Sequence, residues 1–117
     1  MTYLASPYSS SDATTREQRF EAVQRATLIL IQRGCVLFSP IAYSHQFAAE
    51  IGTAFEPWAA FDLAMIDAAD EVWVLMLAGW RESVGVQAEL RHARAAWKPV
   101  VFLDPVTLEP VNTLKIG

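Results

Sequence analysis

The sequence predicts one α/β domain, a three-layer sandwich in which helices cover a parallel Rossmann or flavodoxin-like sheet of four to five strands. Short apolar runs alternate with segments of helical periodicity along all 117 residues, a length that corresponds to about one domain. The run from Val72 to Leu77 is apolar without interruption, which is typical of a strand covered on both faces. Such alternation favours a parallel sheet, because helices supply the crossover connections that parallel strands need.

The first half of the chain supplies two strands and one long helix. Residues 3–5 form the first expected strand, and a polar loop follows it. A helix is expected over 14–33 and ends at Gly34, because apolar positions recur there at three- and four-residue steps: Phe20, Val23, Thr27, Leu30 and Ile31. Residues 35–38 are expected to form the second strand.

The second half repeats this pattern. The segment 41–57 is ambiguous and is expected to be a loop with a short helix around 45–51. The remaining expected elements are a helix over 58–69, a strand over 71–77, a helix over 83–97, a strand over 99–103 and a short edge strand within 107–116. Right-handed crossovers leave few topologies for this order, of which the flavodoxin-like one is the simplest.

Composition limits the class of protein. The chain is 53% hydrophobic, which excludes a disordered tail, and its net charge of −4 gives no basic patch for a nucleic acid polymer. The N-terminus lacks the features of a signal peptide, and the longest apolar run is too short to cross a bilayer. The single cysteine, Cys35, cannot form an internal disulfide, so a cytoplasmic location is expected.

Asp62 interrupts the apolar stripe of the helix expected over 58–69. A carboxylate that faces a core is costly unless it is paired, hydrogen-bonded or protonated. A structural interpretation, in which Asp62 lies at the edge of the stripe and caps a neighbouring loop, is equally open. Asp67 and Asp70 lie off that stripe or at the helix end, and they are interpreted as structural or solvated.

The segment 83–89 joins the third strand to the next helix and contains a second carboxylate. Ser83 is a plausible N-cap, and Gly85 lacks a Cβ, so a ligand can approach the helix start closely. Both features also suit an ordinary helix start. Glu89 borders the apolar stripe and either faces a pocket above the sheet or pairs with a neighbouring arginine. Asp62 and Glu89 thus flank the same strand end, and paired carboxylates in a cleft are what glycosidic bond cleavage uses.

Other residues supply fewer indications. His45 follows the second strand and either enters the pocket rim or has a structural role, whereas His92 is expected to be solvated. Trp58 and Trp80 are placed near the pocket or a dimer rim, with a core role equally open. No histidine or carboxylate cluster has metal-ligand spacing, so neither a metal nor a cofactor is expected. The sequence lacks the G-x-G-x-x-G motif of dinucleotide-binding folds, the P-loop motif of NTPases and the G-x-S-x-G motif of α/β-hydrolases.

Four segments resemble the nucleoside 2-deoxyribosyltransferase family, which includes a branch of 2'-deoxynucleoside 5'-monophosphate N-glycosidases. Residues 3–8, YLASPY, resemble its first strand and the loop that follows. Residues 61–63, FDL, resemble the segment that carries its aspartate, and 83–89 match the S-x-G-x-x-x-E segment that carries its nucleophilic glutamate. Residues 98–101, KPVV, resemble the next strand.

The resemblance implies that Glu89 attacks C1' of a deoxyribosyl group and that water or a second base resolves the covalent intermediate. Asp62 would assist departure of the base or hold the sugar, and Tyr3 would orient Glu89. Ser6, Ser83, Gly85, His45 and Trp80 are the candidate substrate-binding residues. Nucleoside or nucleotide is then the expected small-molecule partner, and a homodimer or larger homo-oligomer the expected assembly.

The chain departs from the family pattern at two places. Transferases of the family often carry an aspartate where this chain has Ser83; a serine there resembles the monophosphate-hydrolysing branch. That branch has glycine and arginine in its first loop, whereas this loop reads SPYSSS, and the segments around His45 and Trp80 are more similar to a small relative group of the same fold. The alternatives to an enzyme are a catalytically silent nucleotide-binding or sensing module and a structural subunit.

Overall fold

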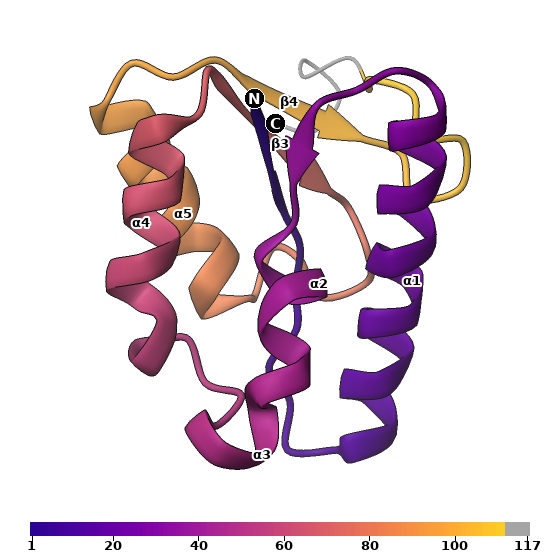
Figure 1. The fold of residues 1–117 in the computed structure, drawn as a ribbon, viewed down its shortest axis with the longest axis vertical. Helices are drawn as coiled ribbons and strands as arrows, with labels where there is room; N and C mark the ends of the chain where they lie inside the picture. Colours follow the sequence, from indigo (N-terminus) through magenta and orange to yellow (C-terminus); the bar gives the residue numbers. More distant parts are fainter. Residues whose placement is uncertain (112–117) are drawn as a thin grey trace.

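The computed structural model, which describes residues 1–111, is an α/β domain with a four-stranded parallel sheet (Figure 1). The strands are β1 (Thr2–Ala5), β2 (Leu37–Phe38), β3 (Glu71–Leu75) and β4 (Val100–Leu103), in the order β2-β1-β3-β4. The larger helices are α1 (Ala13–Gln32), α4 (Ala59–Ala68) and α5 (Val84–Ala95). The flavodoxin-like order of the first four strands is therefore confirmed.

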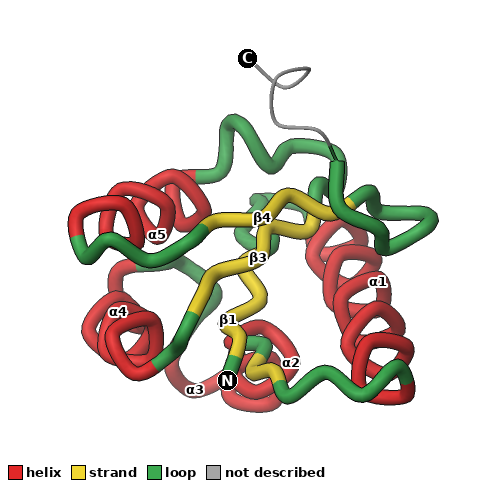
Figure 2. Tube along the Cα trace, turned by 90° about the horizontal axis from the view of Figure 1, so that it is seen from above, coloured by secondary structure: helices red, strands yellow, loops and turns green. Residues whose placement is uncertain are grey.

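Figure 2 shows the three layers, with α1 on one face of the sheet and α4 and α5 on the other. Because side chains alternate across a strand, β1 contributes to two cores. Leu4 packs with residues of α1, including Val23 and Leu30. Tyr3 and Ala5 face the opposite way, into a core that α4 and α5 complete.

The segment between β2 and α4 is more helical than expected. It contains α2 (Pro40–Ser44), η1 (His45–Phe47), α3 (Ala48–Ile51) and η2 (Glu56–Trp58). Ser39 begins α2 by accepting a hydrogen bond from the Ala42 amide at 3.1 Å, a capping signal that the sequence contains. These short elements lie at the carboxyl end of the sheet, where they help to form the site described below (Figure 1).

The other boundaries differ by a few residues. β2 is only two residues long, and β3 ends at Leu75, where the chain leaves the sheet toward Gly79, whose φ is +91°. The edge strand expected within 107–116 is described only as far as residue 111, and there Pro110 forms one antiparallel bridge with Leu103 of β4. Residues 112–117 lie outside the described residues. Within the described residues, no helix has the length and apolar character needed to cross a membrane.

Candidate active site

A cavity of about 370 Å³ lies at the carboxyl ends of β1 and β3. In the order β2-β1-β3-β4, the connection from β1 leads to β2 on one side and the connection from β3 leads to β4 on the other. The position between β1 and β3 is therefore the switch point of the sheet, where open parallel sheets bind ligands. The loop after β1, the segment between α2 and α4, and the start of α5 enclose it. The lining residues used below are Ser6, Tyr8, Ser9, Thr53, Phe55, Glu56, Trp58, Asp62, Glu82, Ser83, Gly85 and Glu89.

Glu89 lies on the inward face of α5 and reaches the inner part of the cavity. Its side chain is buried, at 4% exposure, and its carboxylate accepts a hydrogen bond from the Tyr3 hydroxyl. Burial raises the pKa of Glu89 from 4.5 to about 8, the Tyr3 hydrogen bond acts in the opposite direction, and the nearby Asp62 charge raises it further. The ionised form of Glu89 is therefore costly but specifically stabilised by Tyr3.

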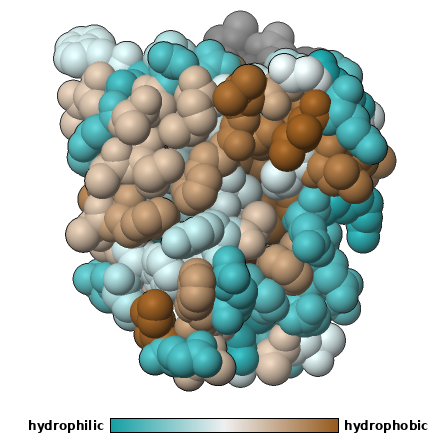
Figure 3. All heavy atoms as spheres, viewed as in Figure 1, coloured by the Kyte–Doolittle hydropathy of each residue, from teal (hydrophilic) through white to brown (hydrophobic). Residues whose placement is uncertain are grey.

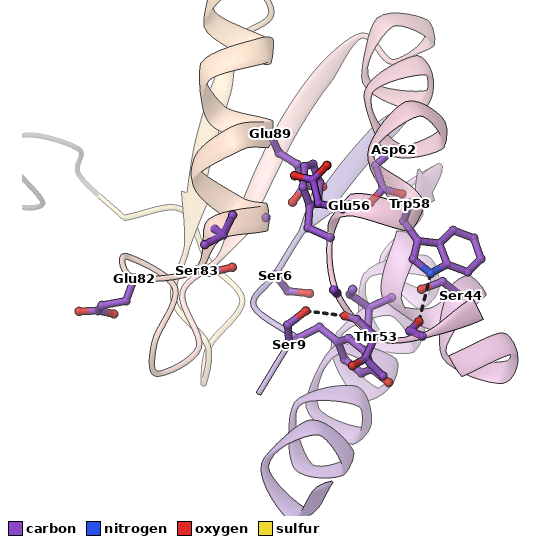
Figure 4. Close-up of a pocket in the computed structure, with 17 residues that line it drawn as sticks. Ser6, Ser9, Ser44, Thr53, Glu56, Trp58, Asp62, Glu82, Ser83 and Glu89 are labelled. Carbon is purple, nitrogen blue, oxygen red and sulfur yellow. Dashed lines mark hydrogen bonds between the residues drawn. The ribbon is translucent and has the colours of Figure 1, made fainter. Parts of the chain in front are cut away.

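Asp62 extends from α4 toward the same cavity (Figure 4). It is 6% exposed, and its Oδ1 atom is buried without a hydrogen-bond partner among the described residues. Desolvation raises the pKa of Asp62 from 3.8 to about 7. An unpaired buried carboxyl oxygen is unfavourable for folding, so its place in a cavity indicates a role toward a ligand.

Together, Asp62 and Glu89 form a pair of carboxyl groups from neighbouring helices on one cavity. Since two nearby carboxylates repel each other, such a pair retains a proton near neutral pH. Tyr3 donates a hydrogen bond to Glu89, whereas no donor among residues 1–111 contacts Oδ1 of Asp62. The Tyr3 hydrogen bond favours the ionised form of Glu89, whereas burial acts against it and raises its pKa to about 8, above the value of about 7 for Asp62. An ionised Glu89 beside a protonated Asp62 is the distribution that a nucleophile and a general acid require.

Tyr3 comes from β1 and is fully buried beneath the carboxyl pair. Desolvation, together with the charges of Glu89 and Asp62, raises its pKa well above 10, so the hydroxyl keeps its proton and acts as a donor. The position of Tyr3 follows from the alternation of β1, which directs residue 3 toward α4 and α5.

Replacing Tyr3 by phenylalanine should lower the rate of the reaction proposed below by about tenfold or more, because an ionised Glu89 would lose its donor. It should also move the ascending limb of the pH profile of kcat/KM to higher pH, since the Tyr3 hydrogen bond lowers the pKa of Glu89. Tyr43→Phe is the matched control, because Tyr43 is 43% exposed and does not line the cavity. A slower variant with an unshifted pH profile would contradict this role.

Small residues form the outer part of the cavity. The Ser6 hydroxyl, directly after β1, is buried without a partner among the described residues. Ser83 begins α5, its hydroxyl accepting a hydrogen bond from the Val86 amide at 3.2 Å, so the expected N-cap is confirmed. Gly85 follows in the first turn, where an added Cβ would lie 3.2 Å from the Phe55 ring. Its missing side chain therefore allows Phe55 to pack over the helix start.

Two expected substrate-binding residues do not line this cavity. The Trp80 ring packs against Phe102, with ring centroids 5.4 Å apart, and belongs to the surroundings of the core. His45 lies behind Tyr8: its Nδ1 is 2.7 Å from the Tyr8 hydroxyl, and its ring stacks on Phe20 with centroids 3.8 Å apart. Contacts with neighbouring aromatic rings hold both side chains away from the edge of the pocket, where the sequence suggested that they lie.

His92 is partly exposed to solvent, and it also contacts the neighbouring helix. Its Nε2 lies 2.7 Å from Oδ1 of Asp67, which joins α5 to α4 on the surface. This contact helps to hold together the two helices that carry Glu89 and Asp62. Among residues 1–111, no cluster of three or more histidine, cysteine or carboxylate side chains could hold a metal ion.

Residues 52–56 form one wall of the cavity, a position that the sequence did not predict. The Ser9 hydroxyl donates to the Thr53 carbonyl, and Trp58 Nε1 donates to the Gly52 carbonyl at 3.4 Å (Figure 4). Gly52 has a φ of +101°, a conformation that favours glycine. That glycine, between α3 and η2, was the only local signal that the chain turns back over the sheet.

Arg19, on α1, is a second element that the sequence did not reveal. Its guanidinium donates to the Ser9 carbonyl at 2.9 Å and to the carbonyls of Tyr8 and Ala78 at 3.4 Å each. It therefore joins the loop after β1 to the loop after β3, the two strand ends on which the cavity is built.

The fold and the site define an α/β domain with a two-carboxyl cavity at the switch point of its sheet. The model of one family, described as Domain of unknown function (DUF1937), matches residues 1–104, and the chain belongs to that family. No curated protein matches the chain significantly.

Proposed function

We propose that this protein cleaves or transfers the N-glycosidic bond of a nucleoside, a deoxynucleoside or a nucleoside 5'-monophosphate. The observation that carries the proposal is the pair Asp62 and Glu89, buried on one cavity, with Tyr3 bonded to Glu89. The resemblance of residues 83–89 to the nucleophile segment of the nucleoside 2-deoxyribosyltransferase family supports the same roles. Carboxyl pairs of this kind act at anomeric carbons, where one attacks and the other transfers protons.

In the first step, an ionised Glu89 oxygen forms a bond to C1' while the bond from C1' to the base nitrogen breaks. The electron pair of that bond goes to the base, and a protonated Asp62 supplies a proton if the departing base needs one. In the second step, water or another base attacks C1', its proton passes to Asp62, and Glu89 is released as a carboxylate. These steps use side chains and substrate only.

The cavity supplies the remaining functions. Trp58 and Tyr8 present aromatic surfaces on which a base can stack. The unpartnered Ser6 hydroxyl and the start of α5 can bind the hydroxyl or phosphate at the 5' end of the sugar. Its volume of about 370 Å³ lies within the range of small-molecule sites.

The direct test is release of free base. The protein would be incubated with a panel of ribonucleosides, deoxynucleosides and their 5'-monophosphates, each with and without a second base, and the products separated by chromatography. We expect release of a base, or its exchange, for at least one member of the panel. Binding without turnover that Glu89→Gln leaves unchanged would instead indicate a silent nucleotide-binding or sensing module.

We also propose a homodimer. Apolar side chains gather on the face where β2 and the second half of α1 lie (Figure 3), and three of them are strongly exposed: Leu28 at 55%, Ile31 at 52% and Val36 at 74%. Such a patch favours self-association. Light scattering should give the mass of a dimer, and Ile31→Lys should give a monomer with its fold intact. A monomeric wild type would contradict this part of the proposal.

The cellular setting that we propose is the cytoplasm. Cys35 is free and only partly exposed, and a chain without disulfides suits a reducing compartment.

A further inference from the structure

The charged side chains that line the cavity are all acidic. Asp62 and Glu89 form its inner part, Glu56 lies on its wall, and Glu82 lies at the rim, directed outward (Figure 4). Among residues 1–111, no lysine, arginine or histidine lines it. A ligand in this cavity therefore meets negative charge that no lining cation balances.

Three arginines of the segments around the cavity have contacts elsewhere, among them Arg81, whose guanidinium lies 5.0 Å from the centre of the Trp80 ring. Arg19 donates to main-chain carbonyls after β1 and β3, and Arg16 donates to the Ser10 carbonyl. These contacts stabilise the loops that enclose the cavity. A ligand that needed an arginine from either position would have to break them.

The inner carboxyls lack the groups that would stabilise their charge. Oδ1 of Asp62 has no hydrogen-bond partner in the described chain, and Asp62 is 6% exposed. Desolvation is the largest cause that raises the pKa of both Asp62 and Glu89. A positive charge on the ligand would favour the ionised forms, whereas a negative charge would oppose them further.

The aromatic side chains that line the cavity also favour a positively charged ligand. Trp58, Tyr8 and Phe55 line the cavity, and aromatic faces attract cations, tryptophan most strongly. The cavity thus combines carboxyl groups at its inner end, whose ionised forms a cation would stabilise, with aromatic surface on its walls, which is a typical environment for a flat cationic ring.

On these grounds, and resting on the proposed glycosyl chemistry, we propose that the preferred substrate is an N-glycoside whose base carries a formal positive charge, such as a pyridinium nucleoside. The step balances without an acid. Glu89 bonds to C1', the C1'–N bond breaks, and its electron pair neutralises the ring nitrogen, so that the base leaves uncharged. The bound cation favours an ionised Asp62, which then accepts the proton of the water that resolves the intermediate.

Three probes of nearly the same shape test the charge. Nicotinamide riboside carries a pyridinium cation, nicotinic acid riboside adds a carboxylate that cancels it, and the dihydronicotinamide riboside is uncharged. Each would be used as the riboside and the 2'-deoxyriboside. We expect the cation to bind the Glu89→Gln protein, which cannot turn it over, at least tenfold more tightly than either other probe. Wild-type kcat/KM should follow the same order.

Two variants separate charge from shape. Glu56→Gln should weaken binding of the cation severalfold and leave the uncharged probe unchanged, and Asp62→Asn should do so more strongly. Glu50→Gln, an exposed glutamate outside the cavity, is the matched control. Loss of affinity for all probes alike would show a structural effect and would overturn the charge argument.

The outcomes distinguish this inference from the proposed function. Selective binding of the cation without base release would support the charge preference and overturn the glycosyl chemistry. Turnover of neutral deoxynucleosides or of 5'-monophosphates in preference to the cation would overturn the charge preference and retain the glycosyl chemistry. Neither binding nor turnover of any probe would overturn both.

Discussion

Glu89→Gln should reduce base release by at least about 10³-fold, the largest effect expected of any single substitution on activity. Glutamine keeps the size of the side chain and can still accept a hydrogen bond from Tyr3, so the cavity should keep its shape. It cannot form the ester with C1', because its amide oxygen is a poor nucleophile. The rate should be measured by chromatography of the released base, under conditions in which wild-type turnover is linear.

The covalent intermediate gives a second readout. Rapid quenching of the wild-type reaction should yield protein heavier by one glycosyl group, attached to the peptide that contains Glu89, and Glu89→Gln should show none. Glu50→Gln is the matched control, an exposed glutamate on α3 away from the cavity. Unchanged turnover by Glu89→Gln, with the protein folded by circular dichroism, would remove the nucleophile assignment.

The fold could be predicted because its signals are local. An uninterrupted apolar run identified β3, the three- and four-residue spacing identified α1 and α5, and Gly34, with a φ of +95°, ended α1 as expected. The polar residues at strand ends could be placed for the same reason, since parallel strands bring their carboxyl ends to one edge. Ser6 lies at such a strand end, whereas Ser83 and Gly85 were predicted from the helix start and from the resemblance of residues 83–89.

The two carboxyls were predicted as deviations from the apolar stripes. Asp62 interrupts the buried face of α4, and Glu89 lies between Val86 and Ala93, both fully buried. That they meet on one cavity depends on how α4 and α5 pack together, which the spacing within either helix does not specify. The resemblance supplied their expected roles, and the structure supplies their shared cavity.

The wall formed by residues 52–56 could not be predicted, because long-range contacts hold it. Two hydrogen bonds hold it: the Ser9 hydroxyl donates to the Thr53 carbonyl, and Trp58 Nε1 donates to the Gly52 carbonyl. Such hydrogen bonds to the main chain leave no periodic pattern in the sequence. His45 and Trp80 were misplaced for a related reason, since a ring at a strand end packs on whichever apolar surface the fold brings to it.

The buried carboxyls should also make stability depend on pH in an unusual direction. A carboxyl whose pKa is raised on folding binds more protons in the native state than in the unfolded chain, so stability falls as pH rises between the two pKa values. For Glu89 that window runs from 4.5 to about 8, and for Asp62 from 3.8 to about 7. For Glu89 alone, the loss is on the order of 4 kcal/mol above pH 8.

Other carboxyls act in the opposite direction at low pH. Hydrogen bonds from nearby backbone and side-chain groups lower the pKa of Asp12 and of Asp104. Their contribution to stability is therefore lost as pH falls below about 4. The two effects together predict maximal stability near pH 4, rather than at pH 7 to 8.

Removing the buried charges should therefore stabilise the protein at alkaline pH while it abolishes activity. Asp62→Asn and Glu89→Gln should each raise the free energy of unfolding by about 4 kcal/mol at pH 8.5, or Tm by about 10–20 °C. At pH 5, where the native wild-type groups are protonated, the difference should fall to about 1–2 kcal/mol. Glu50→Gln, an exposed glutamate outside the cavity, is the control. Chemical denaturation at both pH values measures the effect, and a gain of the same size at pH 5 would show that repacking, rather than the buried charge, is its cause.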